Sequence, residues 1–269
     1  MSDSKFTLYD LNEKSGWLLS SFMDKEDSHY SPLLQLGRTN FLDPWEDKDF
    51  HHHTNSLEIY LLVEGILWIA VDNIPIRMKG CSLLVVQPGF SHSVIGGEGK
   101  INHYGMKVPH SNDERVTNET PENILDLKEK MKTSVVLKPL KKSVGFYIDL
   151  NKKENQNHWI LGFGNAFYET DKLCLAYVNF PNKDEFEKDT HPYALHYHVE
   201  STEWYLTLEG KQTLLVNDEE IGVSKGNLLR VPKNTPHNLI SYEYPFRGVT
   251  IRTPNVPEDK IILEEIKRY

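Results

Sequence analysis

Two stretches of the chain place paired histidines shortly before a glutamate. They read HHHTNSLEIYLLVEG over residues 51–65 and HYHVESTEWYLTLEG over residues 196–210. Side chains two positions apart in a β-strand point to the same side, so His51 and His53 should share one face, as should His196 and His198. His52 lies between two of these residues, should point away, and is therefore not expected to be a ligand.

The second stretch belongs to a repeat of the first. A shift of 145 positions superposes the two without a gap, and the register continues until residues 107–116 meet residues 252–261. The residues able to bind a metal coincide throughout: His51, His53, Glu58 and His92 fall on His196, His198, Glu203 and His237. The chain is therefore predicted to hold two copies of one domain.

Each copy offers three imidazoles and one carboxylate, a donor set suited to a divalent transition metal. An octahedral ion would keep two positions open for water, dioxygen or a chelating substrate, whereas closed tetrahedral sites are usually structural. We therefore expect a divalent ion in each copy. Iron or manganese is favoured, and zinc, nickel, cobalt and copper are compatible with the same donors.

Short segments with alternating apolar residues, separated by turn residues, predict that both copies are all-β barrels or sandwiches. Two helices are expected outside the repeats. One would link the copies, with Ile124, Leu127 and Met131 on one side, and the other would end the chain with Ile262, Ile266 and Tyr269 along a stripe. The predicted domains are residues 1–118 and 136–269, joined by a linker helix at 119–135.

The spacing of these residues resembles the two motifs of the cupin superfamily. In the second copy the first motif is matched by His196, His198, Glu203 and Gly210, and the second motif by Gly226, Pro232 and His237. Asn234 stands where that family usually has glycine, and it can adopt the same left-handed conformation.

The first copy resembles the same motifs through His51, His53, Glu58, Gly65, Gly80, Gly89 and His92. It departs from them at Gln87, which takes the proline position and is followed by Pro88. The resemblance implies a bicupin, with two tandem jelly-roll barrels related by a pseudo-twofold axis and a few peripheral helices. It does not specify the reaction, because the superfamily includes dioxygenases, decarboxylases, isomerases, hydrolases and plain binding proteins.

Five further residues could act on a substrate. Tyr60 and Tyr205 lie two positions beyond the glutamates and should face the interior, where each either forms a hydrogen bond with the substrate or the ligand carboxylate, or fills the lumen. Lys107 and Arg252 are aligned cations that either bind a carboxylate or phosphate or belong to a solvated strand end. His103 has Gly248 as its counterpart, so it is either a general base of the first copy alone or a structural residue.

Three functions remain open. The favoured one is a metal-dependent enzyme, in its preferred form a dioxygenase similar to cupin quercetinases, that acts on a small oxygenated and possibly anionic metabolite. The second is a non-oxidative isomerase, lyase or decarboxylase for a sugar or keto acid, and the third is a non-catalytic binding protein. The second copy matches the motifs more closely, so we expect it to be a working site.

The charge and composition of the chain limit the classes of partner that it is expected to bind. A net charge of -9 argues against nucleic acid and anionic membranes as partners. No apolar run has the length of a membrane span, and the first residues lack a secretory pattern. The chain has two cysteines, Cys81 and Cys174, and both lie in apolar stretches. Two cysteines are too few for a disulfide framework, so a cytoplasmic location is expected. A small-molecule substrate is the expected partner, and a homo-oligomer is possible.

Overall fold

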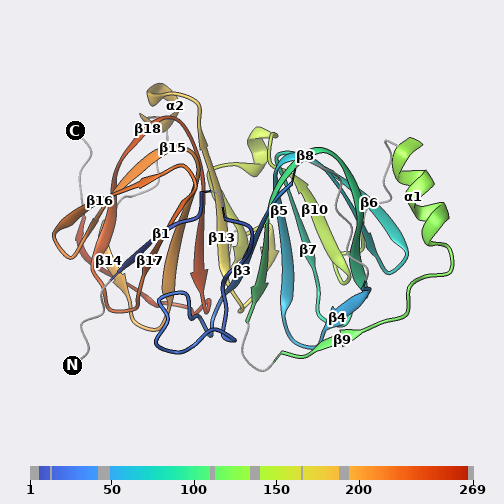
Figure 1. Cartoon of the computed structure of the whole chain (residues 1–269). Coiled ribbons are helices and arrows are strands. Elements are labelled where there is room, and N and C mark those ends of the chain that lie inside the picture. The colour runs from blue at the N-terminus through green and yellow to red at the C-terminus, as the bar shows by residue number, and fades with distance from the viewer. Residues whose placement is uncertain are drawn as a thin grey trace. The chain divides into compact units, whose positions relative to one another are not determined.

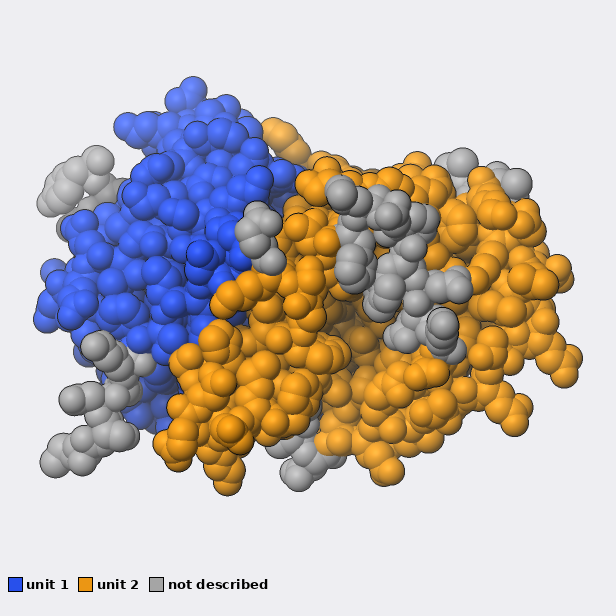
Figure 2. Space-filling model, viewed as in Figure 1, with its two compact units in different colours: residues 1–12, 154–269 blue, residues 13–153 orange. Residues whose placement is uncertain are grey.

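The computed structural model describes residues 6–12, 14–41, 49–109, 113–133, 140–164, 166–187 and 194–265. The chain forms two compact units (Figure 2). We call residues 13–153 the first barrel and residues 1–12 with 154–269 the second barrel. Both are built almost entirely from β-strands, most of them antiparallel (Figure 1).

The first barrel contains the strands β2 (Gly16–Leu19), β3 (Gln35–Phe41), β4 (His51–His53), β5 (Leu57–Val71), β6 (Ile74–Lys79), β7 (Ser82–Val86), β8 (His92–Val108), β9 (Arg115–Thr117) and β10 (Gly145–Asp149). Its main strand order is β10-β7-β5-β8-β3-β2, and β4 pairs with both β8 and β9.

The second barrel contains β1 (Thr7–Asp10), β11 (His158–Gly162), β12 (Tyr168–Glu169), β13 (Cys174–Phe180), β14 (Ala194–His198), β15 (Thr202–Val216), β16 (Glu219–Ser224), β17 (Asn227–Val231), β18 (His237–Thr253) and β19 (Lys260–Glu265). Its main order is β1-β17-β15-β18-β13-β11-β12, and β14 pairs with β18 and β19. The two barrels therefore repeat one strand connectivity. This confirms the predicted all-β fold of two tandem jelly-roll barrels.

The long strands bend at the glycines of the first motif. Gly65 has a φ of 91° and Gly210 a φ of 71°. A Cβ atom on Gly65 would collide with the carbonyl oxygen of Lys100, and one on Gly210 with those of Glu243 and Pro245. Glycine is required at both positions because the backbone is left-handed and a neighbouring strand passes directly over it.

Apolar side chains fill part of the interior of each barrel. In the first barrel this core is formed by Leu62, Leu67, Ile69, Val71, Ile76, Met78, Leu84, Val86, Val94 and Ile101, together with Tyr60. In the second barrel the corresponding core is formed by Leu214, Val216, Val223, Leu229 and Val231, together with Tyr205. The tyrosines therefore lie where the apolar core meets the polar part of each lumen.

The units differ from the predicted domains at their ends. Strand β1, from the start of the chain, pairs with β17 of the second barrel, and β10 pairs with β7 of the first. Each of these strands covers the edge of a sheet that would otherwise expose unpaired backbone groups. The repeat identifies the two copies but not which short flanking strand covers which edge.

The prediction of one helix is confirmed, and the prediction of the other is wrong. Helix α1 (Ile124–Thr133) lies within the predicted linker and against β6 (Figure 1), and it buries Leu127 and Met131 next to Trp68. The predicted terminal helix is instead strand β19, paired with β14; Ile266 and Tyr269 lie outside the described residues. A strand is favoured there because it supplies backbone partners to β14, which carries two histidines.

Two further short helical segments are present, α2 (Lys183–Glu187) and a 3₁₀ turn at Lys153–Asn155. No helix in the described part of the chain has the length and hydropathy needed to cross a membrane.

Candidate metal centres

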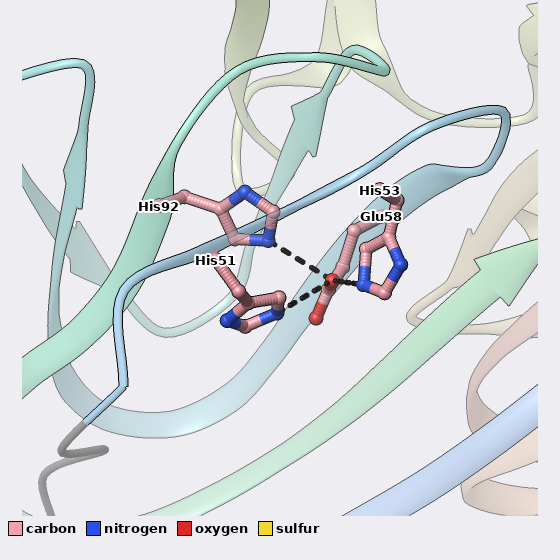
Figure 3. Close-up of side chains that lie close together, drawn as sticks. All are labelled: His51, His53, Glu58 and His92. Carbon is pink, nitrogen blue, oxygen red and sulfur yellow. Dashed lines mark hydrogen bonds and ion pairs between the residues drawn. The ribbon is translucent and has the colours of Figure 1, made fainter. Parts of the chain in front are cut away.

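The first centre lies inside the first barrel. β4 supplies His51 and His53, β5 supplies Glu58, and β8 supplies His92 (Figure 3). The Nε2 atoms of His53, His92 and His51 lie 2.8, 3.0 and 3.6 Å from Oε2 of Glu58. Four potential ligand atoms thus gather within 4.8 Å of one another.

The second centre reproduces this geometry. Nε2 of His237, His198 and His196 lies 2.8, 3.2 and 3.7 Å from Oε2 of Glu203. All four residues are buried. The eight residues predicted as ligands therefore form two clusters with matching geometry.

Backbone carbonyls fix the tautomer of four of the six histidines. Nδ1 lies 3.1 Å from the Asp49 carbonyl oxygen in His51 and 2.8 Å from that of Phe90 in His92. The corresponding distances are 2.7 Å from Ala194 for His196 and 2.8 Å from Thr235 for His237. A carbonyl oxygen can only accept, so Nδ1 carries a proton, and in the neutral ring the lone pair of Nε2 faces the cluster, as metal coordination requires.

A carboxylate lies behind each of the remaining two histidines, and the sequence reasoning missed both. His53 Nδ1 lies 2.7 Å from Oδ2 of Asp113, and His198 Nδ1 lies 3.3 Å from Oδ2 of Asp259. The repeat contained a signal, because it superposes the acidic pair 113–114 on the acidic pair 258–259. A carboxylate behind a ligating histidine holds the ring in place and makes it a stronger ligand.

Backbone amides hold these two carboxylates. Asp113 accepts hydrogen bonds from the N–H groups of Asn55 and Ser56, and Asp259 from those of Glu200 and Ser201. Burial would raise the pKa of Asp113, but these amides and His53 lower it below its usual value. The side chain is thus held as an anion that accepts from the imidazole.

The central glutamates are ionised as well. Burial alone would raise the pKa of Glu58, but the charge of His92 and hydrogen bonds from the three histidines hold it well below its usual range. Burial opposes the ionisation of Glu203 in the same way, and hydrogen bonds from its three histidines lower its pKa. When the three imidazoles are neutral, as metal ligands must be, they and the carboxylate form a donor set with one negative charge that fits a divalent cation.

A left-handed turn precedes the last histidine of each centre. Gly89 has a φ of 84° and Asn234 a φ of 59°, which confirms the conformation predicted for Asn234. The Gly89 amide donates to the carbonyl oxygen of His53 at 2.8 Å, and the Asn234 amide to that of His198 at 2.6 Å. These bonds tie the turn to the strand that carries the histidine pair.

Each centre opens onto a cavity. The cavity of the first barrel has a volume of about 580 Å³ and is lined by His51, His53 and Glu58 together with Tyr60, His103, Lys107 and Arg115. The cavity of the second barrel has about 270 Å³ and is lined by His196, His198 and Glu203 together with Trp159, Tyr205, Arg252 and Lys260. The five residues suggested for substrate contact therefore all line a cavity that contains metal-ligand candidates.

His52 lies apart from the first centre. Its Nδ1 is 3.0 Å from Oδ1 of Asn118. It is absent from the cluster formed by its two neighbours in sequence, in agreement with the alternation of side chains along a strand.

Protonation differs between the two lumens. Burial lowers the pKa of His103 to about 4, so this ring is neutral at pH 7 and is a weak base. Burial, followed by the charge of Glu203 and a hydrogen bond with it, raises the pKa of Tyr205 well above its usual value, so its phenol stays protonated. Burial also lowers the pKa of Lys107, although Glu58 and Asp113 partly oppose this.

Arg252 has partners inside the second barrel. Its Nη2 lies 3.1 Å from Sγ of Cys174 and 3.2 Å from Oδ1 of Asn255, and its guanidinium lies 5.8 Å from the ring centre of Trp159. Cys174 and Cys81 are both buried and form no disulfide. Arg252, the counterpart of Lys107, is therefore held within the wall of the second barrel.

Comparison with known proteins identifies the fold. Residues 183–247, which include every ligand candidate of the second centre, match the cupin domain family. No curated protein matches the chain. A mutant of salicylate 1,2-dioxygenase from Pseudoaminobacter salicylatoxidans in complex with gentisate superposes with a TM-score of 0.62 at 15% identity, over 97% of this chain and 86% of that one.

The chain therefore has the fold of a bicupin. Gentisate adducts of the same dioxygenase give a TM-score of 0.58 at 14% identity, over 93% of the bicupin and 81% of the enzyme. A further structure of salicylate 1,2-dioxygenase, from Pseudaminobacter salicylatoxidans, gives 0.54 at 17% identity, over 83% and 71%. At these identities the similarity is one of fold, and the two clusters of the bicupin are sites that fit metal binding.

Proposed function

We propose that this bicupin is an iron-dependent dioxygenase that acts on a small hydroxylated carboxylic acid in its first barrel. The observation that carries the proposal is the convergence of three histidine Nε2 atoms and the Glu58 carboxylate at the wall of a cavity of about 580 Å³. Such a donor set leaves coordination positions open, and the cavity has the size of an ordinary ligand site.

Cavity size favours the first barrel over the second, although the second matches the sequence motifs more closely. The second cavity has less than half the volume, and it is also lined by two cations, Arg252 and Lys260. In the first barrel Lys107 and Arg115 line the same cavity as the metal ligands. Two cations beside an open metal site suit a substrate that carries a carboxylate.

Lys107 is suited to hold that carboxylate. It pairs in register with Glu58 across β5 and β8, and its Nζ lies 3.7 Å from Oδ2 of Asp113. A substrate carboxylate would meet a cation that an existing anion already keeps in position. Relatives of the same fold bind gentisate, a hydroxylated aromatic acid, in solved structures.

Bound iron would supply open positions at which a chelating substrate and dioxygen meet. The chain's own residues orient the reactants. Asp113 fixes the ring of His53, and Lys107 positions the carboxylate. His103, neutral and 6.1 Å from the ring centre of Tyr60, offers a hydrogen bond without adding charge. Trp17 and Phe22 add apolar surface to the lining of the same cavity.

Oxygen uptake with gentisate or salicylate, measured on metal-free protein with and without added Fe(II), tests the proposal. We expect consumption that requires Fe(II), is lost in His53→Ala and is retained in His198→Ala. Full turnover without oxygen would contradict it. Incorporation of solvent deuterium into product under those conditions would indicate the isomerase or lyase reaction. Absence of metal from the purified protein, with unchanged ligand binding in both variants, would indicate a binding protein.

A further inference from the structure

The lumens of the two barrels differ at one cross-strand pair. Gly37 on β3 lies opposite Gly105 on β8 in the first barrel. The corresponding pair in the second barrel is Ala176 on β13 and Thr250 on β18. The next strand carries the same residue in both barrels, because Tyr60 pairs with Gly105 and Tyr205 with Thr250.

All six residues of these two rows line the cavities. The first barrel therefore has two residues without side chains where the second has a methyl group and a threonine side chain. The cavity volumes differ in the direction that this predicts: the first cavity has about 580 Å³ and the second about 270 Å³. The missing side chain at Gly105 is one physical cause of the larger cavity.

The two glycines have different reasons to be glycine. A Cβ atom on Gly37 would lie 2.9 Å from Cε3 of Trp17, so the packing of that ring requires glycine. A Cβ atom on Gly105 would meet only Nε2 of His103, at 3.9 Å, and its backbone is not left-handed. Neither packing nor backbone conformation therefore requires glycine at position 105, and its effect is to leave room in the cavity.

The space beside Gly105 lies between polar groups. Along the inward face of β8 its neighbours are Lys107 and His103, which pair with Gln35 and Thr39 on β3. The matching pairs of the second barrel are Arg252 with Cys174 and Gly248 with Val178. A ligand filling this space would have a cation at one end and a neutral imidazole at the other.

We propose that Gly105 determines which ligands reach the first metal centre, admitting carboxylic acids larger than a single ring that Thr250 excludes from the second. This rests on the proposed function for the charge of the ligand, and on the cavity for its size. Cavities of about 300 to 1,000 Å³ hold ordinary organic ligands. The first barrel falls within that range and the second lies below it.

Calorimetric binding of two probes to cobalt-loaded protein tests the role of Gly105 without any turnover. The probes are salicylate, with one ring, and a hydroxynaphthoate, with two. Wild type should bind both. Gly105→Thr should weaken hydroxynaphthoate by about tenfold or more, since one extra side chain in a pocket has effects of that order, while changing salicylate much less. The affinity of Gly105→Ala for hydroxynaphthoate should lie between those of wild type and Gly105→Thr.

Thr250→Gly is the matched control in the other barrel and should leave binding to the first barrel as in wild type. Retained cobalt content and thermal midpoint would show that Gly105→Thr folds. Equal binding of both probes by Gly105→Thr and wild type, equal losses of both, or no binding by wild type would overturn the inference. Size discrimination without any oxygen uptake by the iron form would leave it standing and refute the dioxygenase.

Discussion

At the residue scale, the centres depend on groups that never touch the metal. Asp113 accepts from His53, and Asp259 lies behind His198 at a longer distance. Neither belongs to the four-residue pattern that identifies the ligands. A site reduced to its ligands would therefore omit the carboxylate that holds the ring of His53 and the one that lies behind His198.

Asp113→Asn should weaken metal binding at the first centre. The amide keeps the size of the carboxylate but loses its charge, so His53 becomes a poorer ligand and affinity should fall about 10- to 100-fold. Competition with a chromophoric chelator measures this. Asp259→Asn is the matched change in the second barrel and should affect only the second centre. Unchanged affinity in both variants would contradict the role of these carboxylates.

His103 should make the metal-free protein sensitive to acid. Its pKa is about 4 in the folded chain and ~6.5 when unfolded. The folded state therefore binds fewer protons than the unfolded state between these values, and stability is complete above pH 6.5 and lost as the pH falls. Between pH 6.5 and pH 5 the loss is roughly 2 kcal/mol from this group.

Urea unfolding of wild type and His103→Asn at both pH values, with metal removed from each, measures that difference. The variant should lose less stability on acidification than wild type does. The same dependence on pH in both proteins would show that His103 does not titrate as its burial predicts.

At the scale of elements, each barrel depends on a strand that lies far away in the sequence. Leu11, just after β1, is fully buried, and its amide donates to the carbonyl oxygen of Gly226 at 2.9 Å. Leu150, just after β10, is equally buried and donates to Cys81 at 3.1 Å in the first barrel. The two leucines are structural counterparts.

Leu11→Ala should destabilise the second barrel, and Leu150→Ala the first, each by about 2 to 5 kcal/mol through the cavity left in the core. Amide exchange followed by mass spectrometry locates the effect. Protection should fall in β17 for Leu11→Ala and in β7 for Leu150→Ala. Loss of protection in β7 alone after Leu11→Ala would contradict the assignment of the first strand to the second barrel.

The elements also show what the sequence could predict. The ligand strands, the glycine bends and the turn at Asn234 follow from local patterns, because each depends on the chemistry of nearby residues. Helix α1 was predictable for the same reason. The terminal strand β19 was not, because its partner β14 lies more than 60 positions earlier and decides strand over helix. The difference between Gly105 and Thr250 lies inside the aligned repeat, but that between their partners Gly37 and Ala176 needed the register of β3 and β13, which lie outside it.

At the scale of the whole molecule, the two clusters predict two bound metals per chain. Metal analysis of untagged protein should find two equivalents in wild type and one in each of His53→Ala and His198→Ala. Removing both ions with a chelator should lower the thermal midpoint, because ligand at about 100 times its dissociation constant contributes about 2.7 kcal/mol. One equivalent in wild type, lost in only one variant, would show that the cluster left intact in that variant does not bind metal.

The pairing of β1 with the second barrel has a consequence for biosynthesis. Asp10 pairs with Asn227, so 217 residues (227 minus 10) separate the two while the ribosome extends the chain. All strand pairs described for the first barrel lie within residues 13–153, so this barrel can fold as it emerges, whereas β1 must wait until most of the polypeptide has been made. Tyr9 of β1 and Leu11 just after it are buried in the folded chain. Until β17 is made they have no such partner, which makes this short segment a natural site for chaperones to bind.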